Sequence, residues 1–373
     1  MRVVFLFMTT GGTNDIPTWN PKATAQNKYL DNGGLESEGL YWMLKEMKAK
    51  GFIKDMLLII ESSRGCGRFK LNGNLGFVVP HISEVDKVLR KGDVLFVRGG
   101  FRGWHDWLAS KKGKHWLVLY AANTGRQRWP WWDAILDDLD LELRIDTENR
   151  LWFPFSKPVH EEIFRFIPES NPIYDFCIGA SFIHDRKGQW RTIRALEEYK
   201  KIYGKIPKCI MPGAVRHSTQ TNKILGLAKD LGVDMPGMVP RSDLNVILNS
   251  SKVFVHLGTS GQNDRGPIEA LRCGCQLIIG TPAYHSPYIT YGKYCTVPKN
   301  KDDFGSVARL FRDILKHYSP KDRNKATSWY NKTSGSDYLI PTMGRLFSSF
   351  GESAPSLDFI KERYSNEAFG GYL

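Results

Sequence analysis

Short apolar runs alternate with amphipathic stretches along most of the chain. Residues 2–8 form a continuous apolar run, which is typical of a strand in a parallel sheet covered on both faces. Residues 36–50 instead carry apolar positions at helical spacing, among them Leu40 and Leu44, and Gly51 marks the end of that helix. The pattern therefore predicts an α/β protein.

The alternation of strand and helix runs through the chain twice. The first series predicts strands at residues 2–8, 55–60, 94–97, 116–120 and 151–155, and helices at 36–50, 104–110 and 159–166. The second predicts strands at residues 174–178, 208–211, 253–257 and 276–279, and helices at 187–203, 222–231, 241–250, 267–273 and 303–318. Two such series indicate two doubly wound, Rossmann-like domains facing each other across a cleft, with ligands bound at the carboxyl ends of the strands.

Turn-forming residues separate the two series and place the domain boundaries. The segment 168–172 (PESNP) divides residues 1–170 from residues 171–335. Within the second series, Ser242 or Asp243 is expected near the N-terminal cap of the helix at 241–250. A last helix, at residues 339–350, comes after the second series is complete. Residues 336–373 are therefore expected to form a C-terminal helix and tail.

Composition limits the classes of function. A chain of 373 residues is too long for one ordinary core and suits two domains. The net charge of +13 favours an anionic partner such as a nucleotide, a nucleic acid, or an acidic glycan or lipid, but charge alone does not choose among these.

Cysteine placement and apolar run lengths bear on metal binding and location. The six cysteines include no CxxC pair, so a structural zinc site is not expected. Cys177, Cys273 and Cys275 lie in or beside apolar runs and are expected to be buried thiols, as in a reducing compartment. No apolar run reaches the length of a membrane span, and the N-terminus is typical of a first strand rather than a signal peptide, which favours the cytoplasm.

The clearest candidate site follows the apolar run at residues 253–257. A small, polar loop leads to Pro267, which suits the first turn of a helix, and a helix N-terminus preceded by glycines offers free N–H groups to an anion. Glu269 is expected in that first turn. There it would accept hydrogen bonds from sugar hydroxyls or merely complement the helix dipole, and the pattern alone weighs the two equally.

A second candidate site follows the strand at residues 174–178. Arg186 and Lys187 precede the next helix and could neutralise a diphosphate, on which negative charge grows as a glycosidic bond breaks. Taken alone, this pair is more often a solvated surface feature.

Two further regions lie in the first series. Gly11 and Gly12 follow the first strand and would let the backbone approach a ligand, although they do not form a GxGxxG motif and an ordinary loop is the alternative. A basic, aromatic region could stack sugars or bases and hold phosphates, or be a basic surface with a few core tryptophans. Its candidate residues are Arg98, Arg102, Trp104, His105, Arg126 and Arg128.

The acidic stretch at residues 137–140 contains the spacing of an Asp-x-Asp motif. It is amphipathic, and its aspartates are expected to be solvated.

Taken in order, the features of the second series resemble the large glycosyltransferase family 4 and related retaining enzymes of the GT-B fold. The matching pieces are Ile178-Gly179, Arg186-Lys187-Gly188, Gly237-Met238-Val239-Pro240-Arg241-Ser242-Asp243-Leu244, and residues 253–260, 266–274 and 276–282. The resemblance implies that Arg186 and Lys187 contact the donor diphosphate, that Val239 lies near the base, and that Glu269 binds the ribose. It further implies an acceptor-side domain at 1–170, a nucleotide-sugar-binding domain at 171–335, and a C-terminal helix that packs back on the first domain.

The implied activity is transfer of a sugar, with retention, from a UDP- or GDP-linked donor to a hydroxyl of an unidentified acceptor, without a metal or other cofactor. The remaining donor-side candidates are Gly11, Gly12, Ser181, Thr259, Gln262, Asn263, Arg265 and Gly266. Arg98, Arg102, Trp104, Arg126 and Arg128 are the acceptor-side candidates, and His105 joins the basic pair as a catalytic candidate.

The chain departs from the family pattern at two places. The family has two glutamates eight residues apart, whereas the earlier position is Gly261, and the strand-end arginine of many members is Ser181. Other interpretations therefore stay open. The basic charge also suits an enzyme that glucosylates hydroxymethylated bases of viral DNA, and the same fold serves sugar-nucleotide epimerases and non-catalytic binding modules.

Overall fold

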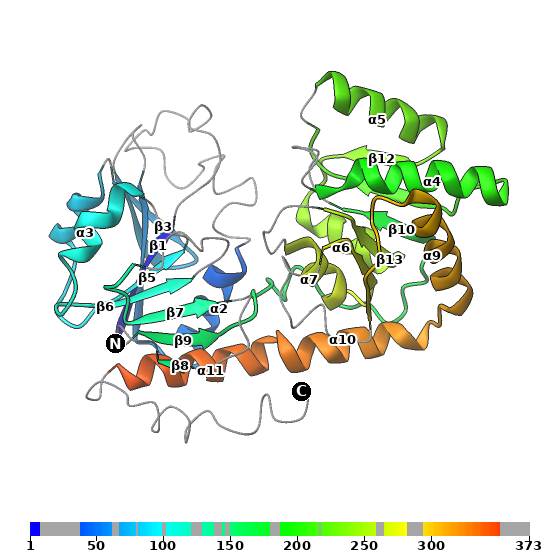
Figure 1. The fold of residues 1–373 in the computed structure, drawn as a ribbon. Coiled ribbons are helices and arrows are strands. Elements are labelled where there is room, and N and C mark those ends of the chain that lie inside the picture. Colours follow the sequence, from blue (N-terminus) through cyan, green and yellow to red (C-terminus); the bar gives the residue numbers. More distant parts are fainter. Residues whose placement is uncertain are drawn as a thin grey trace. The chain divides into compact units, whose positions relative to one another are not determined.

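A computed structural model describes residues 1–7, 38–61, 67–79, 81–98, 102–120, 129–137, 144–145, 150–179, 187–215, 218–258, 265–281 and 294–350. The chain divides into two compact units. Unit 1 contains Met1–His160 and Ser336–Leu373, and unit 2 contains Glu161–Gly335. Each unit is built on its own largely parallel sheet (Figure 1), which confirms the predicted α/β class with two Rossmann-like sheets.

The sheet of unit 1 has nine strands in the order β3-β4-β2-β1-β5-β6-β7-β9-β8. They are β1 (Arg2–Phe7), β2 (Asp55–Glu61), β3 (Gly67–Leu71), β4 (Asn74–Val79), β5 (Val94–Arg98), β6 (Trp116–Tyr120), β7 (Ala134–Asp137), β8 (Arg144–Ile145) and β9 (Leu151–Pro154). Only the edge strands β3 and β8 run antiparallel to their neighbours. The strand order reverses between β1 and β5, because β2 to β4 are added on one side of β1 and the later strands on the other. At this reversal Phe7 of β1 pairs with Arg98 of β5.

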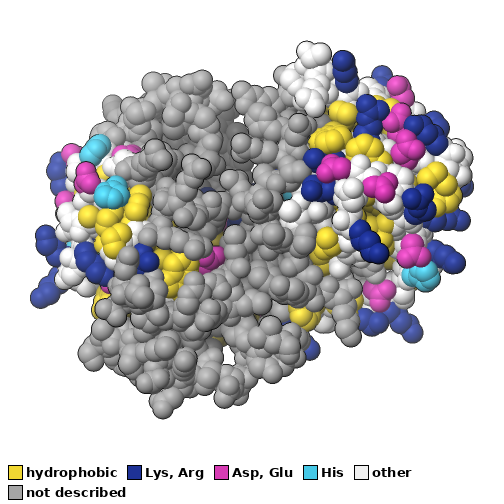
Figure 2. Space-filling model, viewed as in Figure 1, with side chains coloured by type: hydrophobic (Ala, Val, Ile, Leu, Met, Phe, Trp, Pro, Cys, Tyr) yellow, Lys and Arg dark blue, Asp and Glu magenta, His cyan; other side chains and the backbone are white. Residues whose placement is uncertain are grey.

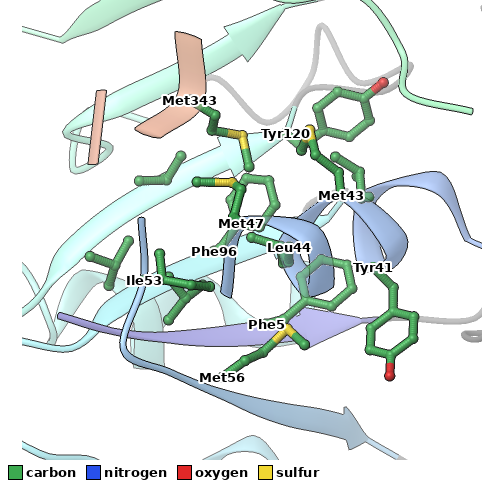
Figure 3. Close-up of a cluster of buried hydrophobic side chains, with 14 of the residues drawn as sticks. Phe5, Tyr41, Met43, Leu44, Met47, Ile53, Met56, Phe96, Tyr120 and Met343 are labelled. Carbon is green, nitrogen blue, oxygen red and sulfur yellow. The ribbon is translucent and has the colours of Figure 1, made fainter. Parts of the chain in front are cut away.

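Helices cover both faces of this sheet. Helix α2 (Gly39–Ala49) and helix α11 (Ser336–Ser349) share one hydrophobic cluster with the strands, which includes Phe5, Phe96 and Met343 of α11 (Figure 3). The other face packs against the 3₁₀ segments η1 (Ile82–Lys87) and η2 (Arg102–Trp104) and the short helix α3 (His105–Ala109). Each fully buried Leu, Met or Phe in these clusters contributes roughly 1.5–3 kcal/mol of hydrophobic free energy.

The sheet of unit 2 has six parallel strands in the order β12-β11-β10-β13-β14-β15. They are β10 (Tyr174–Ile178), β11 (Cys209–Pro212), β12 (Asp234–Gly237), β13 (Ser251–His256), β14 (Gln276–Ile279) and β15 (Cys295–Thr296). Here the strand order reverses between β10 and β13, because β11 and β12 are added on one side of β10 and β13 to β15 on the other. A ligand site in an open parallel sheet is expected at such a reversal, outside the carboxyl ends of the strands.

The helices of unit 2 divide between the two faces of its sheet. Helices α4 (Gln189–Tyr203), α5 (Thr219–Asp230) and α9 (Phe304–His317) pack on the face that includes Val253 and Val255. Phe254 points the other way and approaches α7 (Arg265–Arg272), which also contacts α10 (Lys321–Thr333). Helix α6 (Arg241–Asn249) contacts β13 as well.

The segment between the two series differs from its predicted form. No helix forms at residues 159–166, where turns and irregular backbone occur instead. The backbone N–H of Arg165 donates to Asn245 Oδ1 over 3.0 Å, and that of Ile167 donates to Asn249 Oδ1 over 2.7 Å. These bonds to α6 explain why residues 161–170 belong with unit 2, whereas the turn formers at 168–172 suggested the first domain.

Three local predictions also need correction. Helix α6 begins at Arg241 after Pro240 and has no side-chain cap, so neither Ser242 nor Asp243 caps it. Asp137 ends the buried strand β7 and is 2% exposed, so it is not part of a solvated acidic face. Helix α10 escaped prediction because its sequence is polar on all sides, although it buries Arg323 and other polar residues.

Within the described part of the chain, no helix is both long enough and apolar enough to cross a membrane.

Candidate functional site

Both candidate motifs of unit 2 leave the sheet at the reversal between β10 and β13. The two strands are paired in register, with Ile178 beside Val255. Gly179 follows β10, and Lys187 stands directly before the start of α4. Leu257 and Gly258 follow β13, and α7 begins after that loop. The motifs singled out in the sequence therefore follow the two strands that flank a typical ligand site.

Glycines let the start of α4 lie directly on the end of β13. Gly188 has a φ of +77°, and a Cβ atom there would lie 2.1 Å from the carbonyl carbon of Leu257 and 2.4 Å from the nitrogen of Gly258. Only glycine accommodates both the left-handed backbone and this contact. The hydroxyl of Thr281, after β14, donates to the Gly258 carbonyl over 2.9 Å. Leu257 and Gly258, directly after β13, are thus contacted from two sides.

The ring of Phe254 is held between the two candidate loops. A Cβ atom at Gly179 would lie 2.1 Å from the Phe254 ring, and one at Gly266 would lie 3.1 Å from it. The residue that follows β10 and the start of α7 therefore both pack on one aromatic side chain.

The start of α4 combines a cation with a helix N-terminus that has no side-chain cap. Lys187 is half-buried and precedes the N-cap residue Gly188, which supplies no side-chain cap, and the first turn carries no acidic residue. A lysine beside an uncapped helix N-terminus matches the requirements of a phosphate group. Arg186 and Ser181 lie outside the described residues.

Glu269 has a different local setting from the one predicted. Helix α7 begins at Arg265 rather than at Pro267, so Glu269 is its fifth residue and lies beyond the first turn. An interaction with the helix dipole falls off within one turn and does not explain this residue. Instead, Glu269 is 5% exposed, and its Oε1 accepts a hydrogen bond from Nη1 of Arg241 over 2.7 Å.

Arg241 was not among the candidates from the sequence, although a signal was present. It stands directly after the turn Gly237-Met238-Val239-Pro240, which does contain a candidate. In that turn Gly237 has a φ of +76°, its carbonyl accepts from the Gly213 N–H over 2.8 Å, and Val239 is half-buried. The ion pair therefore connects the element that carries Val239 to the one that carries Glu269.

Two aromatic and basic candidates of unit 1 have structural roles. Arg98 ends β5 and pairs with Glu38, its Nη2 lying 3.1 Å from a carboxylate that is only 2% exposed. Trp104 is fully buried in the core of unit 1, and its indole N–H donates to Glu61 at the end of β2. A side chain in that position cannot stack on an acceptor in this conformation, so Trp104 is better explained by packing.

His105 is the first residue of α3 and half-buried. Its Nδ1 lies 2.8 Å from Oδ1 of Asp106, and its ring meets Trp129 and Trp131 edge-on at centroid distances of 5.0 and 4.2 Å. These contacts give His105 a packing role that requires no ligand. Arg102 belongs to η2, and its side chain is not described.

The other sequence candidates divide into two sets. Arg265 and Gly266 are the first residues of α7, at the edge of the candidate site. The candidates outside the described residues are Gly11, Gly12, Arg126, Arg128, Thr259, Gln262 and Asn263. Within the part of the chain that the structure describes, no group of three or more His, Cys, Asp or Glu side chains is arranged to hold a metal ion.

The thiols and the surface charge complete the chemistry of the described residues. Four cysteines of unit 2 are buried, namely Cys177, Cys209, Cys273 and Cys275, as predicted for three of them. Burial raises the pKa of Cys275 to about 12, which makes it a poor nucleophile at neutral pH. On the face shown in Figure 2, the Lys and Arg side chains of unit 2 are interspersed with Asp and Glu.

Comparisons with known proteins bear on the fold. No protein-family model matches the sequence, and no curated protein matches it. Solved structures do match. Sucrose-phosphate synthase from Thermosynechococcus elongatus is 12% identical, with a TM-score of 0.64, over 94% of this chain and 99% of that chain. An E. coli trehalose-6-phosphate protein bound with UDP-2-fluoro glucose is 10% identical, with a TM-score of 0.59, over 94% and 98% of the two chains.

A third match is a trehalose-6-phosphate synthase studied with bisubstrate glycomimetics for glycosyl transfer with retention. It is 11% identical, with a TM-score of 0.59, over 94% of this chain and 98% of that chain. At such low identity the likeness establishes the fold, which is GT-B, and does not single out family 4.

Proposed function

We propose that this protein is a retaining glycosyltransferase that moves a sugar from a nucleoside diphosphate sugar to an acceptor hydroxyl. The observation that carries the proposal is the position of both unit 2 motifs at the reversal between β10 and β13, where Gly188 packs on Leu257. The GT-B fold adds support, because a matching protein is bound with UDP-2-fluoro glucose. A UDP-linked donor is therefore tested first, followed by a GDP-linked one.

In this proposal the donor lies across the starts of α4 and α7. Arg186, Lys187 and the backbone N–H groups at the start of α4 bind the diphosphate. Val239 lies near the base, and Glu269 accepts hydrogen bonds from the ribose hydroxyls. Arg265, Gly266, Ser181, Thr259, Gln262 and Asn263 complete the surroundings of the donor, and Gly11 and Gly12 stay donor-side candidates of the first series.

The chemistry follows from where negative charge develops. As the bond between the anomeric carbon and the diphosphate breaks, charge grows on the phosphate oxygens. Fixed cations and helix N-termini stabilise that charge in the transition state, and removal of one such group costs roughly 10²–10³ in kcat. The proposal assigns this task to Lys187 and Arg186 rather than to a metal. Retention is proposed because a matching synthase transfers its glycosyl group with retention.

The acceptor is proposed to bind to unit 1. The matching proteins are named for trehalose-6-phosphate and sucrose-phosphate, and the arginines proposed for the acceptor, Arg102, Arg126 and Arg128, suit a phosphorylated sugar or another small anionic acceptor. His105 remains a candidate base for the acceptor hydroxyl. A DNA acceptor is not proposed, because no comparison points to one.

A screen of nucleotides by thermal shift tests the proposal. UDP, GDP and ADP, each with and without a linked hexose, are added at up to millimolar concentration. A ligand at about 100 times its Kd stabilises the protein by roughly 2.7 kcal/mol, which is readily seen as a rise in Tm. The absence of a shift with every nucleotide would contradict the proposal.

Product analysis then separates transfer from related reactions. With a bound donor identified, a panel of sugar phosphates is tested as acceptors. An acceptor product that keeps the donor's anomeric configuration supports a retaining transferase. Release of free nucleotide without an acceptor product indicates an epimerase or hydrolase instead.

A further inference from the structure

The buried carboxylate of Glu269 is held by a single cation from a neighbouring helix. Nη1 of Arg241 donates to Oε1 of Glu269 over 2.7 Å, and the two side chains are 27% and 7% exposed. The bond engages Oε1, and the described residues place no second donor on Oε2. One oxygen of the carboxylate is thus fixed while the other keeps its capacity to accept.

The guanidinium is itself held in place. Its central carbon lies 5.7 Å from the centroid of the Phe164 ring, so the planar group has an aromatic neighbour as well as a carboxylate. Arg241 is the first residue of α6, whereas Glu269 is in the second turn of α7. The ion pair therefore links the first residue of α6 to the second turn of α7 and holds the two helices together.

We infer that Arg241 is a positioning residue for the nucleotide site, which holds Glu269 in the orientation that leaves Oε2 to the ribose. This inference rests on the proposed function, because it assigns Arg241 to the same site. The pair also ties the turn at residues 237–240, proposed for the base, to the helix proposed for the ribose. Arg241 therefore couples the placement of the two ends of the nucleoside.

An ion pair between two helices can also be purely structural, and unit 2 offers a matched control. Nζ of Lys252 lies 2.7 Å from Oδ1 of Asp175, with side-chain exposures of 32% and 23%. The N–O distance of this pair equals that of the Arg241–Glu269 pair. The pair lies at the amino ends of β10 and β13, whereas the candidate site lies at their carboxyl ends. Loss of Lys252 therefore reports the effect of removing an ion pair from unit 2 alone.

The test is a calorimetric titration of the full-length chain with UDP, GDP and ADP, each in a separate experiment. Five proteins are compared with the wild type: Arg241→Gln, Arg241→Lys, Glu269→Gln, the double variant Arg241→Gln/Glu269→Gln, and Lys252→Gln. Thermal unfolding of each protein is recorded alongside, so that a change in Kd is read against the change in Tm.

The inference predicts a specific set of Kd values. Arg241→Gln and Glu269→Gln each weaken nucleotide binding about tenfold, as expected for loss of a charge-assisted hydrogen bond. The double variant is no weaker than either single variant, because Arg241 acts only through Glu269. Arg241→Lys regains part of the affinity, and Lys252→Gln keeps the wild-type Kd.

The outcomes that overturn the inference differ from those that overturn the proposed function. If Arg241→Gln lowers Tm as Lys252→Gln does but keeps the wild-type Kd, the pair is structural only. If the double variant is about a hundredfold weaker, Arg241 acts on the nucleotide independently of Glu269 and is not a positioning residue. If the wild type binds none of UDP, GDP and ADP, the proposed function fails, and this inference fails with it.

Discussion

Replacement of Gly188 by alanine should damage both the stability and the candidate site of unit 2. Gly188 has a φ of +77°, which costs an L-residue about 1–2 kcal/mol. The added methyl would also lie 2.1 Å from the Leu257 carbonyl carbon, and such overpacking against backbone costs about 1–3 kcal/mol more. We expect the free energy of unfolding to fall by about 2–5 kcal/mol. The start of α4 would also shift away from β13, which weakens nucleotide binding at Lys187.

Gly204, at the other end of the same helix, is the matched control. Its φ is +84°, but a Cβ atom there meets nothing within 4 Å, so Gly204→Ala carries only the backbone cost. For a unit of this size each kcal/mol corresponds to roughly 2–4 °C, so Gly188→Ala should melt roughly 2–12 °C below Gly204→Ala in a thermal scan. Equal Tm values for the two variants would refute the claim that α4 packs directly on the Leu257 backbone.

Three further predictions concern other parts of the chain. Trp104→Phe removes a donor from Glu61 and should destabilise unit 1 by about 1–3 kcal/mol while leaving the Kd for UDP unchanged; a weakened Kd with an unchanged Tm would instead indicate a ligand role. Burial lowers the pKa of His115, against the opposing effect of Asp93, so the unfolded chain binds this proton more readily than the folded one. The stability that His115 contributes above about pH 6.5 should therefore be lost as the pH falls. Between pH 7 and 5, Tm should drop less in His115→Gln than in the wild type. Parallel curves of Tm against pH for the two proteins would contradict this prediction. The four buried thiols of unit 2 should react with a thiol reagent at pH 8 only when unit 2 unfolds, and rapid labelling of any of these four in the native chain would contradict their burial.

The sequence was most informative where apolar runs were long and bounded by glycine. The runs at residues 2–8 and 253–257 predicted the central strands β1 and β13, because continuous apolar strands are buried on both faces. Short or polar elements carried too weak a pattern. Strand β7 has only four residues beside an acidic stretch, and the sequence of α10 is mostly polar. Neither element therefore shows a periodic pattern of apolar residues that would have predicted its burial.

The candidate site shows a similar division. The motifs at Lys187 and Glu269 were found because local chemistry marks them, namely a basic residue before a helix and a helix start after glycines. Arg241 was missed because its partner lies 28 residues further along the chain, and only the fold brings the two together. Trp104 was misjudged for the same reason, since an indole in a basic loop gives no local sign that its N–H will meet a buried carboxylate.

Amide hydrogen exchange with and without a UDP-sugar tests the central claim most directly. If unit 2 binds the nucleotide where its sheet reverses, the ligand should slow exchange at the first turn of α4, which follows Lys187, and in the first two turns of α7, which include Glu269, while α5 stays unchanged. Protection confined to unit 1, or none at saturating ligand, would contradict the assignment of the nucleotide site.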